Sequence, residues 1–200
     1  MESLTQARSN TLAALFPSPA MARLVIFFLV HPGERFHLRE LQRRARLSSA
    51  SVQKELARLT AMGPVRREEA DGRAYYQADE ENGVWGGWMR LLLHGADPVD
   101  VIREALVDAP GLDAAFVFGS VARGTAQPES DLDVFLVGPR AERKRATRLL
   151  GELGYFISRP VDVIGRESEQ FARAEESFLQ RVHAAPKIWV GGDETLARAA

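Results

Sequence analysis

The sequence predicts an α/β (α+β) fold in two domains, of which the second holds a small mixed sheet flanked by helices. Two short runs without a charged residue, 114–118 and 134–137, are typical of strands buried on both faces. Elsewhere, apolar residues recur at the three- and four-residue spacing of helices. In the first part of the chain, Ala70-Asp71-Gly72 is a turn sequence between two strand-like runs, which indicates a β-hairpin.

The composition is that of a globular protein and excludes several kinds of site. Of the 200 residues, 46% are hydrophobic and 26% are charged, and the net charge is −1. The chain has no cysteine, which excludes disulfides, thiolate catalysis and cysteine-bound zinc. The apolar run Leu24–Val30 is far shorter than the roughly 20 residues that span a bilayer. We therefore expect a cytoplasmic protein without a membrane partner.

The first helix is predicted from its two ends and its apolar character. Ser18-Pro19 supplies a cap and a proline at the first helical position, and His31-Pro32-Gly33 ends the helix. Because this helix is apolar nearly all round, we expect it to be buried. Phe36 is predicted to lie in a short strand that follows.

Two short helices joined by a tight turn come next, and a hairpin follows them. The second helix begins near Leu38, the turn is at Arg46-Leu47, and either residue of Ser48-Ser49 can cap the third helix. Strands are expected at 65–69 and 73–77. The predicted inward faces of the two helices consist of Leu38, Leu41 and Ala45, then Val52, Leu56, Leu59 and Met62.

This order of elements makes residues 18–79 resemble the bacterial winged helix-turn-helix regulators of the ArsR-like kind. Between His31 and Arg67 there are nine Lys or Arg residues against three acids, as expected for a segment that binds a phosphate backbone. A domain used only for protein contact or dimerisation is the alternative, and the local basic excess argues against it. The resemblance implies that duplex DNA is contacted at base edges by Ser49, Ser51, Gln53 and Lys54, and at phosphates by Arg43, Arg44, Arg58, Arg66, Arg67 and Arg73.

The second half of the chain is predicted to alternate helices and strands. A connecting helix spans about 80–94, and Gly95 to Pro98 separates it from the next helix. After the second buried strand we expect a helix at 139–153, strands at 155–158 and 161–164, a helix at 168–183 and a last strand at 187–192.

The residues that carry chemistry are placed around the two buried strands. The first strand ends in Gly119-Ser120, and the second begins ten residues later with Asp131-Leu132-Asp133. Residues two apart on a strand point the same way, so Asp131 and Asp133 are expected to project together. Two carboxylates about 4 Å apart repel by roughly 4 kcal/mol at an effective dielectric of about 20, and a bound cation would remove that cost. The glycine permits close approach and the serine offers a hydroxyl, which suits a phosphate group.

These residues resemble the nucleotidyltransferase superfamily typified by DNA polymerase beta, and within it the minimal nucleotidyltransferases. The matching motifs are Gly119-Ser120, Arg123-Gly124, Ser130-Asp131-Leu132-Asp133 and a third acid, Asp162. The resemblance implies transfer of a nucleoside monophosphate from a nucleoside triphosphate to an acceptor, with Mg²⁺ (or Mn²⁺) as cofactor. Asp131 and Asp133 would hold the metal ions, and Asp162 would complete the site and help to deprotonate the acceptor. Gly119 and Ser120 would bind the triphosphate, which Arg123 would approach unless it only braces the loop.

The expected domains are a winged helix at 1–80, a connecting helix at 81–96 and a nucleotidyltransferase domain at 97–200. We expect a homodimer, because winged helices commonly bind palindromic sites. One alternative is a DNA-binding regulator whose second domain senses nucleotides without turnover. The other is an antitoxin-like protein that modifies a partner toxin, as some minimal nucleotidyltransferases do. Three intact acids favour turnover over sensing alone.

Overall fold

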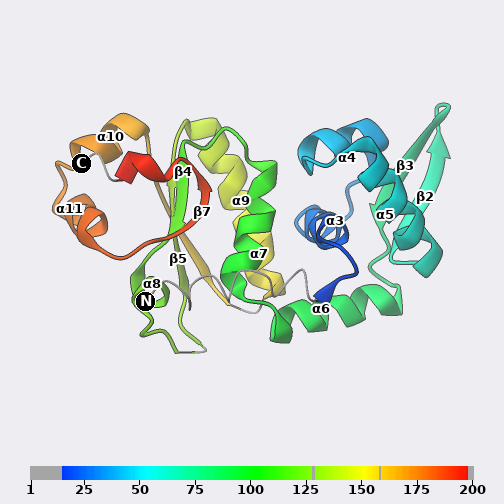
Figure 1. Cartoon of the computed structure of the whole chain (residues 1–200), viewed down its shortest axis with the longest axis horizontal. Coiled ribbons are helices and arrows are strands. Elements are labelled where there is room, and N and C mark those ends of the chain that lie inside the picture. Colours follow the sequence, from blue (N-terminus) through cyan, green and yellow to red (C-terminus); the bar gives the residue numbers. More distant parts are fainter. Residues whose placement is uncertain (1–14, 128, 158, 198–200) are drawn as a thin grey trace. The chain divides into compact units, whose positions relative to one another are not determined.

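The computed structural model describes residues 15–127, 129–157 and 159–197, and the structural statements below concern these residues (Figure 1). The chain forms two compact units, Met1–Asp108 and Ala109–Ala200, here called unit 1 and unit 2. The helix Pro98–Ala105 packs against the helix Pro19–Leu29 and belongs to unit 1. No described helix has the length and apolar character needed to cross a bilayer.

Unit 1 contains helices, a short strand and a hairpin in the order that the sequence predicts. Its three strands form one antiparallel sheet in the order β1-β3-β2. The elements are α3 (Pro19–Leu29), β1 (Phe36–His37), α4 (Leu38–Arg44), α5 (Ser49–Met62), β2 (Val65–Ala70), β3 (Arg73–Ala78), α6 (Gly83–Gly95), α7 (Pro98–Ala105) and the short η1 (Leu106–Asp108).

The ends of these elements follow from local side-chain chemistry. The Ser18 hydroxyl accepts a hydrogen bond from the Met21 amide and caps α3, and Ser48 caps α5 in the same way. Gly63 ends α5 with a left-handed φ of 96°. At the hairpin tip, Asp71 and Gly72 both have positive φ, the geometry of a two-residue turn that matches the twist of paired strands.

Unit 2 is built on a mixed four-stranded sheet in the order β6-β5-β4-β7, which confirms the predicted small mixed sheet flanked by helices. Only the β5–β6 pair is parallel among the described strands. The elements are β4 (Ala114–Val117), α8 (Gly119–Arg123), β5 (Leu132–Val137), α9 (Arg140–Phe156), β6 (Val161–Arg166), α10 (Ser168–Arg173), α11 (Ser177–Ala184), β7 (Ile188–Gly192) and the short η2 (Glu194–Ala197).

Helices cover both faces of this sheet (Figure 1). On one face, Phe116 of β4 stacks on Phe135 of β5 with ring centroids 5.3 Å apart, and Phe171 of α10 packs against both. α9 lies on the opposite face and buries four apolar side chains completely. This burial on both faces explains why β4 and β5 are almost wholly apolar in sequence. The buried α9 residues are Ala146, Leu149, Leu150 and Leu153.

Two predicted elements of unit 2 are wrong in their extent. The strand expected at 155–158 does not form among its described residues, because α9 continues to Phe156 and the Ile157 amide bonds back to the Leu153 carbonyl, 2.9 Å away. The helix expected at 168–183 is two helices, since Ala174 adopts a left-handed φ of 47° after α10. Neither change moves the strands that carry the three acids.

Candidate active site

The three acids that the sequence singled out lie at one end of the unit 2 sheet. β5 and β6 run in parallel, and their register places Asp133 directly beside Asp162. Side chains of residues paired in this way project from the same face of the sheet. Asp131 precedes the first residue of β5, so it belongs to the segment that leads into the strand. The tertiary fold therefore brings together two acids that are far apart in the sequence.

Gly119 lies against the carboxylate of Asp133. The Phe118 amide donates a hydrogen bond to the Asp133 carbonyl, 2.9 Å away, and Gly119 then turns the chain with a left-handed φ of 69°. A Cβ atom placed on Gly119 would be only 1.9 Å from Asp133 Oδ2. Only glycine fits this position for two reasons: the backbone conformation and the space occupied by the acid.

Ser120 and Arg123 lie on α8, the single short helix turn that follows Gly119. The Ser120 carbonyl accepts a hydrogen bond from the Thr125 amide, 3.0 Å away, which closes the turn. Ser120 is partly exposed. Arg123 is exposed, and its positive charge acts on Asp133. Both side chains are thus accessible to a ligand beside the acids.

The negative charges of Asp131 and Asp162 act on the carboxylate of Asp133. Burial raises the pKa of Asp133 above its ordinary value, and the negative charges of Asp162 and Asp131 raise it further. The positive charge of Arg123 acts in the opposite direction. An acid whose ionised form is disfavoured in this way is stabilised by any cation that approaches it.

The donor set fits a hard divalent cation such as Mg²⁺ or Mn²⁺, which prefers carboxylate oxygens. Asp133 and Asp162 supply paired carboxylates at one end of the sheet, and Asp131 lies just before the same strand as Asp133. Among the described residues, no three acid or histidine side chains are already gathered closely enough to hold a metal ion. Asp133 and Asp162 therefore form a carboxylate pair, and Asp131 lies close enough for its charge to act on Asp133.

One residue near this site was missed by the sequence analysis. Arg159 precedes β6 and donates from Nε to the carbonyl of Ser130, 3.1 Å away, and from Nη2 to the same oxygen. Ser130 adjoins Asp131. No pattern in the sequence distinguishes this arginine from the many on the surface, because its partner is a backbone oxygen on another segment.

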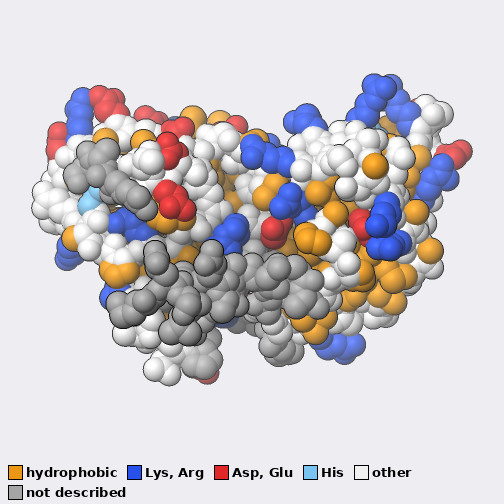
Figure 2. All heavy atoms as spheres, in the orientation of Figure 1, with side chains coloured by type: hydrophobic (Ala, Val, Ile, Leu, Met, Phe, Trp, Pro, Cys, Tyr) orange, Lys and Arg blue, Asp and Glu red, His pale blue; other side chains and the backbone are white. Residues whose placement is uncertain are grey.

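Most of the predicted DNA-contacting residues are exposed on unit 1. Figure 2 shows Lys and Arg side chains over the region that holds α4, α5 and the β2–β3 hairpin. Two of the arginines are held by neighbouring acids, because Arg58 pairs with Glu55 and Arg67 pairs with Glu69. The exposed members of the predicted set are Arg43, Ser49, Gln53, Lys54, Arg58, Arg66, Arg67 and Arg73, and Ser51 is partly exposed.

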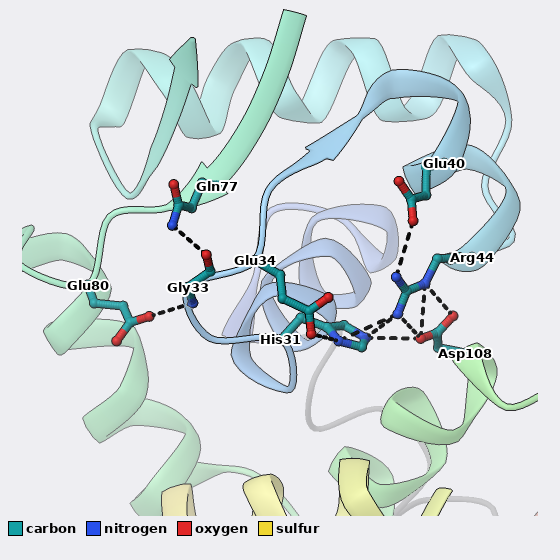
Figure 3. A network of polar contacts seen from close by, with 8 residues as sticks. All are labelled: His31, Gly33, Glu34, Glu40, Arg44, Gln77, Glu80 and Asp108. Carbon is teal, nitrogen blue, oxygen red and sulfur yellow. Dashed lines mark hydrogen bonds and ion pairs between the residues drawn. The ribbon is translucent and has the colours of Figure 1, made fainter. Parts of the chain in front are cut away.

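Arg44 is the exception, and its predicted contact with DNA phosphate requires correction. Its guanidinium lies inside unit 1 with a side chain only 10% exposed, and Nη2 is 2.7 Å from Oδ2 of Asp108, whose side chain is 4% exposed. Figure 3 shows the same guanidinium reaching Glu40 and His31. The rings of Phe27 and Phe36 lie about it, with centroids 5.0 and 4.9 Å from Cζ. A charge enclosed in this way serves the fold, and it is not available to DNA.

Two of the comparisons with known proteins match part of this chain. A search of curated proteins found no match. Among solved structures, one chain described as "Crystal structure of the toxin-antitoxin with AMP-PNP" is similar over 48% of this chain and 75% of that chain, with 21% identity and a TM-score of 0.34. Residues 99–184, which include Gly119 and all three acids, match the family model described as the nucleotidyltransferase domain.

Proposed function

We propose that this chain is an active nucleotidyltransferase, which moves a nucleoside monophosphate from a nucleoside triphosphate to an acceptor in the presence of Mg²⁺. The observation that carries the proposal is the pairing of Asp133 with Asp162 on adjacent parallel strands, with the backbone of Gly119 against Asp133. The match of residues 99–184 to the nucleotidyltransferase family model supports it. Neighbouring carboxylates without a cation repel one another, and both Asp162 and Asp131 act on Asp133 in this way.

In the proposed reaction, an acceptor oxygen bonds to the α-phosphorus of the nucleotide while the bond from that phosphorus to the α,β-bridging oxygen breaks. Pyrophosphate leaves. Asp131, Asp133 and Asp162 would hold the metal ions, which, when bound, neutralise charge on the attacking and leaving oxygens. Asp162 is exposed at the strand edge and takes the proton of the acceptor.

The triphosphate is assigned to the segment between β4 and the end of α8. The backbone of Gly119 lies against Asp133, and the partly exposed Ser120 carries a hydroxyl that can donate to a phosphate oxygen. Arg123 is exposed on the same turn and near enough to act on Asp133, so its charge also reaches a phosphate bound there. These three residues therefore orient the nucleotide above the acids.

The test combines calorimetry with transfer of label. Each of the four common nucleoside triphosphates is titrated into the protein with and without Mg²⁺, and transfer is followed from a triphosphate labelled at its α-phosphorus. Asp133→Asn should abolish metal-dependent transfer, because an amide cannot replace a carboxylate in neutralising the cation. Glu175→Gln removes the same charge from an exposed position of unit 2 and should leave transfer unchanged.

The outcomes separate the alternatives. A folded protein that gives no heat with any nucleotide would refute the site. Binding that depends on Mg²⁺ without any transfer of label would instead indicate a nucleotide-sensing regulator. Label recovered on a protein would indicate the antitoxin-like modifier of a partner, and label recovered on a nucleic acid would indicate a nucleic-acid acceptor.

We further propose that unit 1 is a winged helix-turn-helix of the ArsR-like kind that binds duplex DNA as a homodimer. The order α3, β1, α4, α5, β2, β3 and the exposure of basic side chains on α4, α5 and the hairpin support this proposal. The exposed N-terminal part of α5 would meet base edges through Gln53 and Lys54. Fluorescence anisotropy with the full chain and labelled duplexes should show affinity that falls steeply with salt. Absence of binding at low salt would favour the protein-contact alternative.

A further inference from the structure

We infer that Arg159 is a positioning residue of the proposed nucleotidyl-transfer site, because it holds the segment that presents Asp131. The part of this inference that concerns nucleotidyl transfer rests on the proposed function. Its structural content, that Arg159 fixes the backbone around Asp131, can be measured without any turnover.

Asp131 needs such support because the sheet does not provide it. β5 begins at Leu132, so Asp131 itself lies outside the described ladder between β5 and β6. Asp133, in contrast, lies within β5 opposite Asp162, and its carbonyl accepts the Phe118 amide. Of the two acids in the Asp131-Leu132-Asp133 motif, one is therefore fixed by the sheet, and the other depends on the backbone at either side of it.

Residues 159 and 160 hold the backbone on both sides of Asp131. Before it, the Ser130 carbonyl accepts from Nε of Arg159, at 3.1 Å, and from Nη2 of the same guanidinium. After it, the Leu132 amide donates to the Pro160 carbonyl, 2.9 Å away. Arg159 is itself anchored, since its amide donates to the Gly154 carbonyl at the end of α9, 3.2 Å away.

Ser130 is also hydrogen-bonded to Gln127, which fixes the position of the carbonyl oxygen that Arg159 contacts. The Ser130 amide donates to the Gln127 carbonyl at 3.0 Å, and the Ser130 hydroxyl accepts from the Gln127 amide at 2.9 Å. This small turn orders Ser130 within its own loop. The link from that loop to β6, and hence to Asp162, is made by the Arg159 guanidinium.

The geometry explains why an arginine is used. A guanidinium offers several donors in a fixed plane, so two of them can converge on one carbonyl oxygen, and its charge strengthens both bonds. A lysine could supply the charge and one bond to the same oxygen with less control of direction.

The experiment compares Arg159→Met, Arg159→Lys and the control Arg173→Met, which removes an exposed ion pair of α10 elsewhere in unit 2. Amide hydrogen exchange of the full-length protein is measured at Ser130 and Leu132, whose amides donate to the carbonyls of Gln127 and Pro160 on either side of Asp131, and ATP is titrated calorimetrically over a series of Mg²⁺ concentrations. With Arg159→Met we expect exchange at these two amides to rise by about tenfold or more, as loss of a charge-assisted hydrogen bond implies. The Mg²⁺ concentration needed for half-maximal ATP binding should rise by about tenfold.

Arg159→Lys should recover part of both effects, and Arg173→Met should show neither. A variant Arg159→Met that is less stable but keeps wild-type exchange at Ser130 and Leu132 would overturn the inference, since it would make Arg159 a support of the fold alone. Unchanged Mg²⁺ dependence together with faster exchange would overturn its role in the site. If the wild type binds no ATP, the proposed function fails, and the exchange data alone then decide whether Arg159 holds Asp131.

Discussion

Gly119→Ala offers a sharp test of the site because the chain contains a matched control. Gly119 and Gly124 begin and follow the same short helix, α8, and their φ values are 69° and 70°. At either position, an alanine in the left-handed backbone conformation should lower the free energy of unfolding by about 1–2 kcal/mol. For a unit of this size, each kcal/mol lowers the melting temperature by about 4–8 °C. The two variants should therefore lose similar stability from backbone strain.

The two positions differ in what the new methyl group meets. At Gly124 a Cβ has nothing within 4 Å, whereas at Gly119 it would lie 1.9 Å from Oδ2 of Asp133. Real Cβ contacts stay beyond 3.0 Å, so the carboxylate must move by roughly 1 Å. Cγ and Cβ of Asp133 would also lie only 2.8 and 3.3 Å from the new methyl group, so the whole Asp133 side chain must shift. A misplacement of about 1 Å at a catalytic group can cost about 100-fold in rate.

We therefore expect Gly119→Ala to lose about 100-fold in nucleotidyl transfer and to weaken Mg²⁺-dependent nucleotide binding, while Gly124→Ala keeps both within a few-fold. Thermal unfolding, calorimetry and transfer of α-phosphorus label measure the three quantities. In an Asp133→Ala background, which removes the clashing oxygens, the Gly119→Ala change should lower stability only as much as Gly124→Ala does in the wild type. Equal activity in the two glycine variants would refute the assignment of Asp133 to the site.

Three further predictions concern the buried arginine, the pH dependence and the DNA contacts. Arg44→Met removes the guanidinium that contacts the buried Asp108 and should lower the free energy of unfolding by about 3–5 kcal/mol in a denaturant titration. The exposed Arg43→Met should change it by about 0.5 kcal/mol or less, and similar values for the two variants would contradict the network of Figure 3. Burial and the neighbouring acids raise the pKa of Asp133 in the folded, metal-free protein. The stability that Asp133 contributes is therefore fully present below the ordinary pKa of aspartate and is lost as the pH rises through the raised pKa of the folded state. Asp133→Asn should flatten that part of a melting-temperature profile and make the metal-free protein more stable at neutral pH; an unchanged profile would argue against the repulsion. Arg43→Ala should weaken binding to all duplexes alike and reduce the slope of log affinity against log salt concentration by about 1. Gln53→Ala should change base preference more than affinity, and the reverse pattern would show that α5 does not face the bases.

The secondary structure of the chain was largely readable from its sequence because the signals are local. A serine cap before a proline starts α3, a left-handed glycine ends α5, and an Asp-Gly pair forms the hairpin tip. The runs that became β4 and β5 are apolar because helices cover both of their faces. The two errors of extent arose where a local preference was weak, at the end of α9 and between α10 and α11.

The candidate site was predictable in its residue types and order, since Gly119, Asp131 and Asp133 lie close together in the chain. What the sequence could not supply is the register of β6 against β5, which places Asp162 beside Asp133. Hydrogen bonding between strands sets that register, and the same short apolar run could have paired elsewhere. The contact of Gly119 with the Asp133 carboxylate depends on the same packing.

The arginines show most clearly the difference between what the sequence predicts and what only the tertiary structure shows. From the sequence, Arg43 and Arg44 are adjacent arginines on one helix, and both were predicted to contact DNA phosphate. In the folded chain, Arg43 is exposed, whereas Arg44 is enclosed with Asp108, a residue 64 positions away. Arg159 is likewise defined by a carbonyl on another segment. The sequence by itself determined which helices and strands form, because these depend on residues that are near one another in the chain. Only the tertiary structure decided which charged side chains are paired in the interior, because a buried charge is paired with a residue from whichever distant segment the fold places beside it.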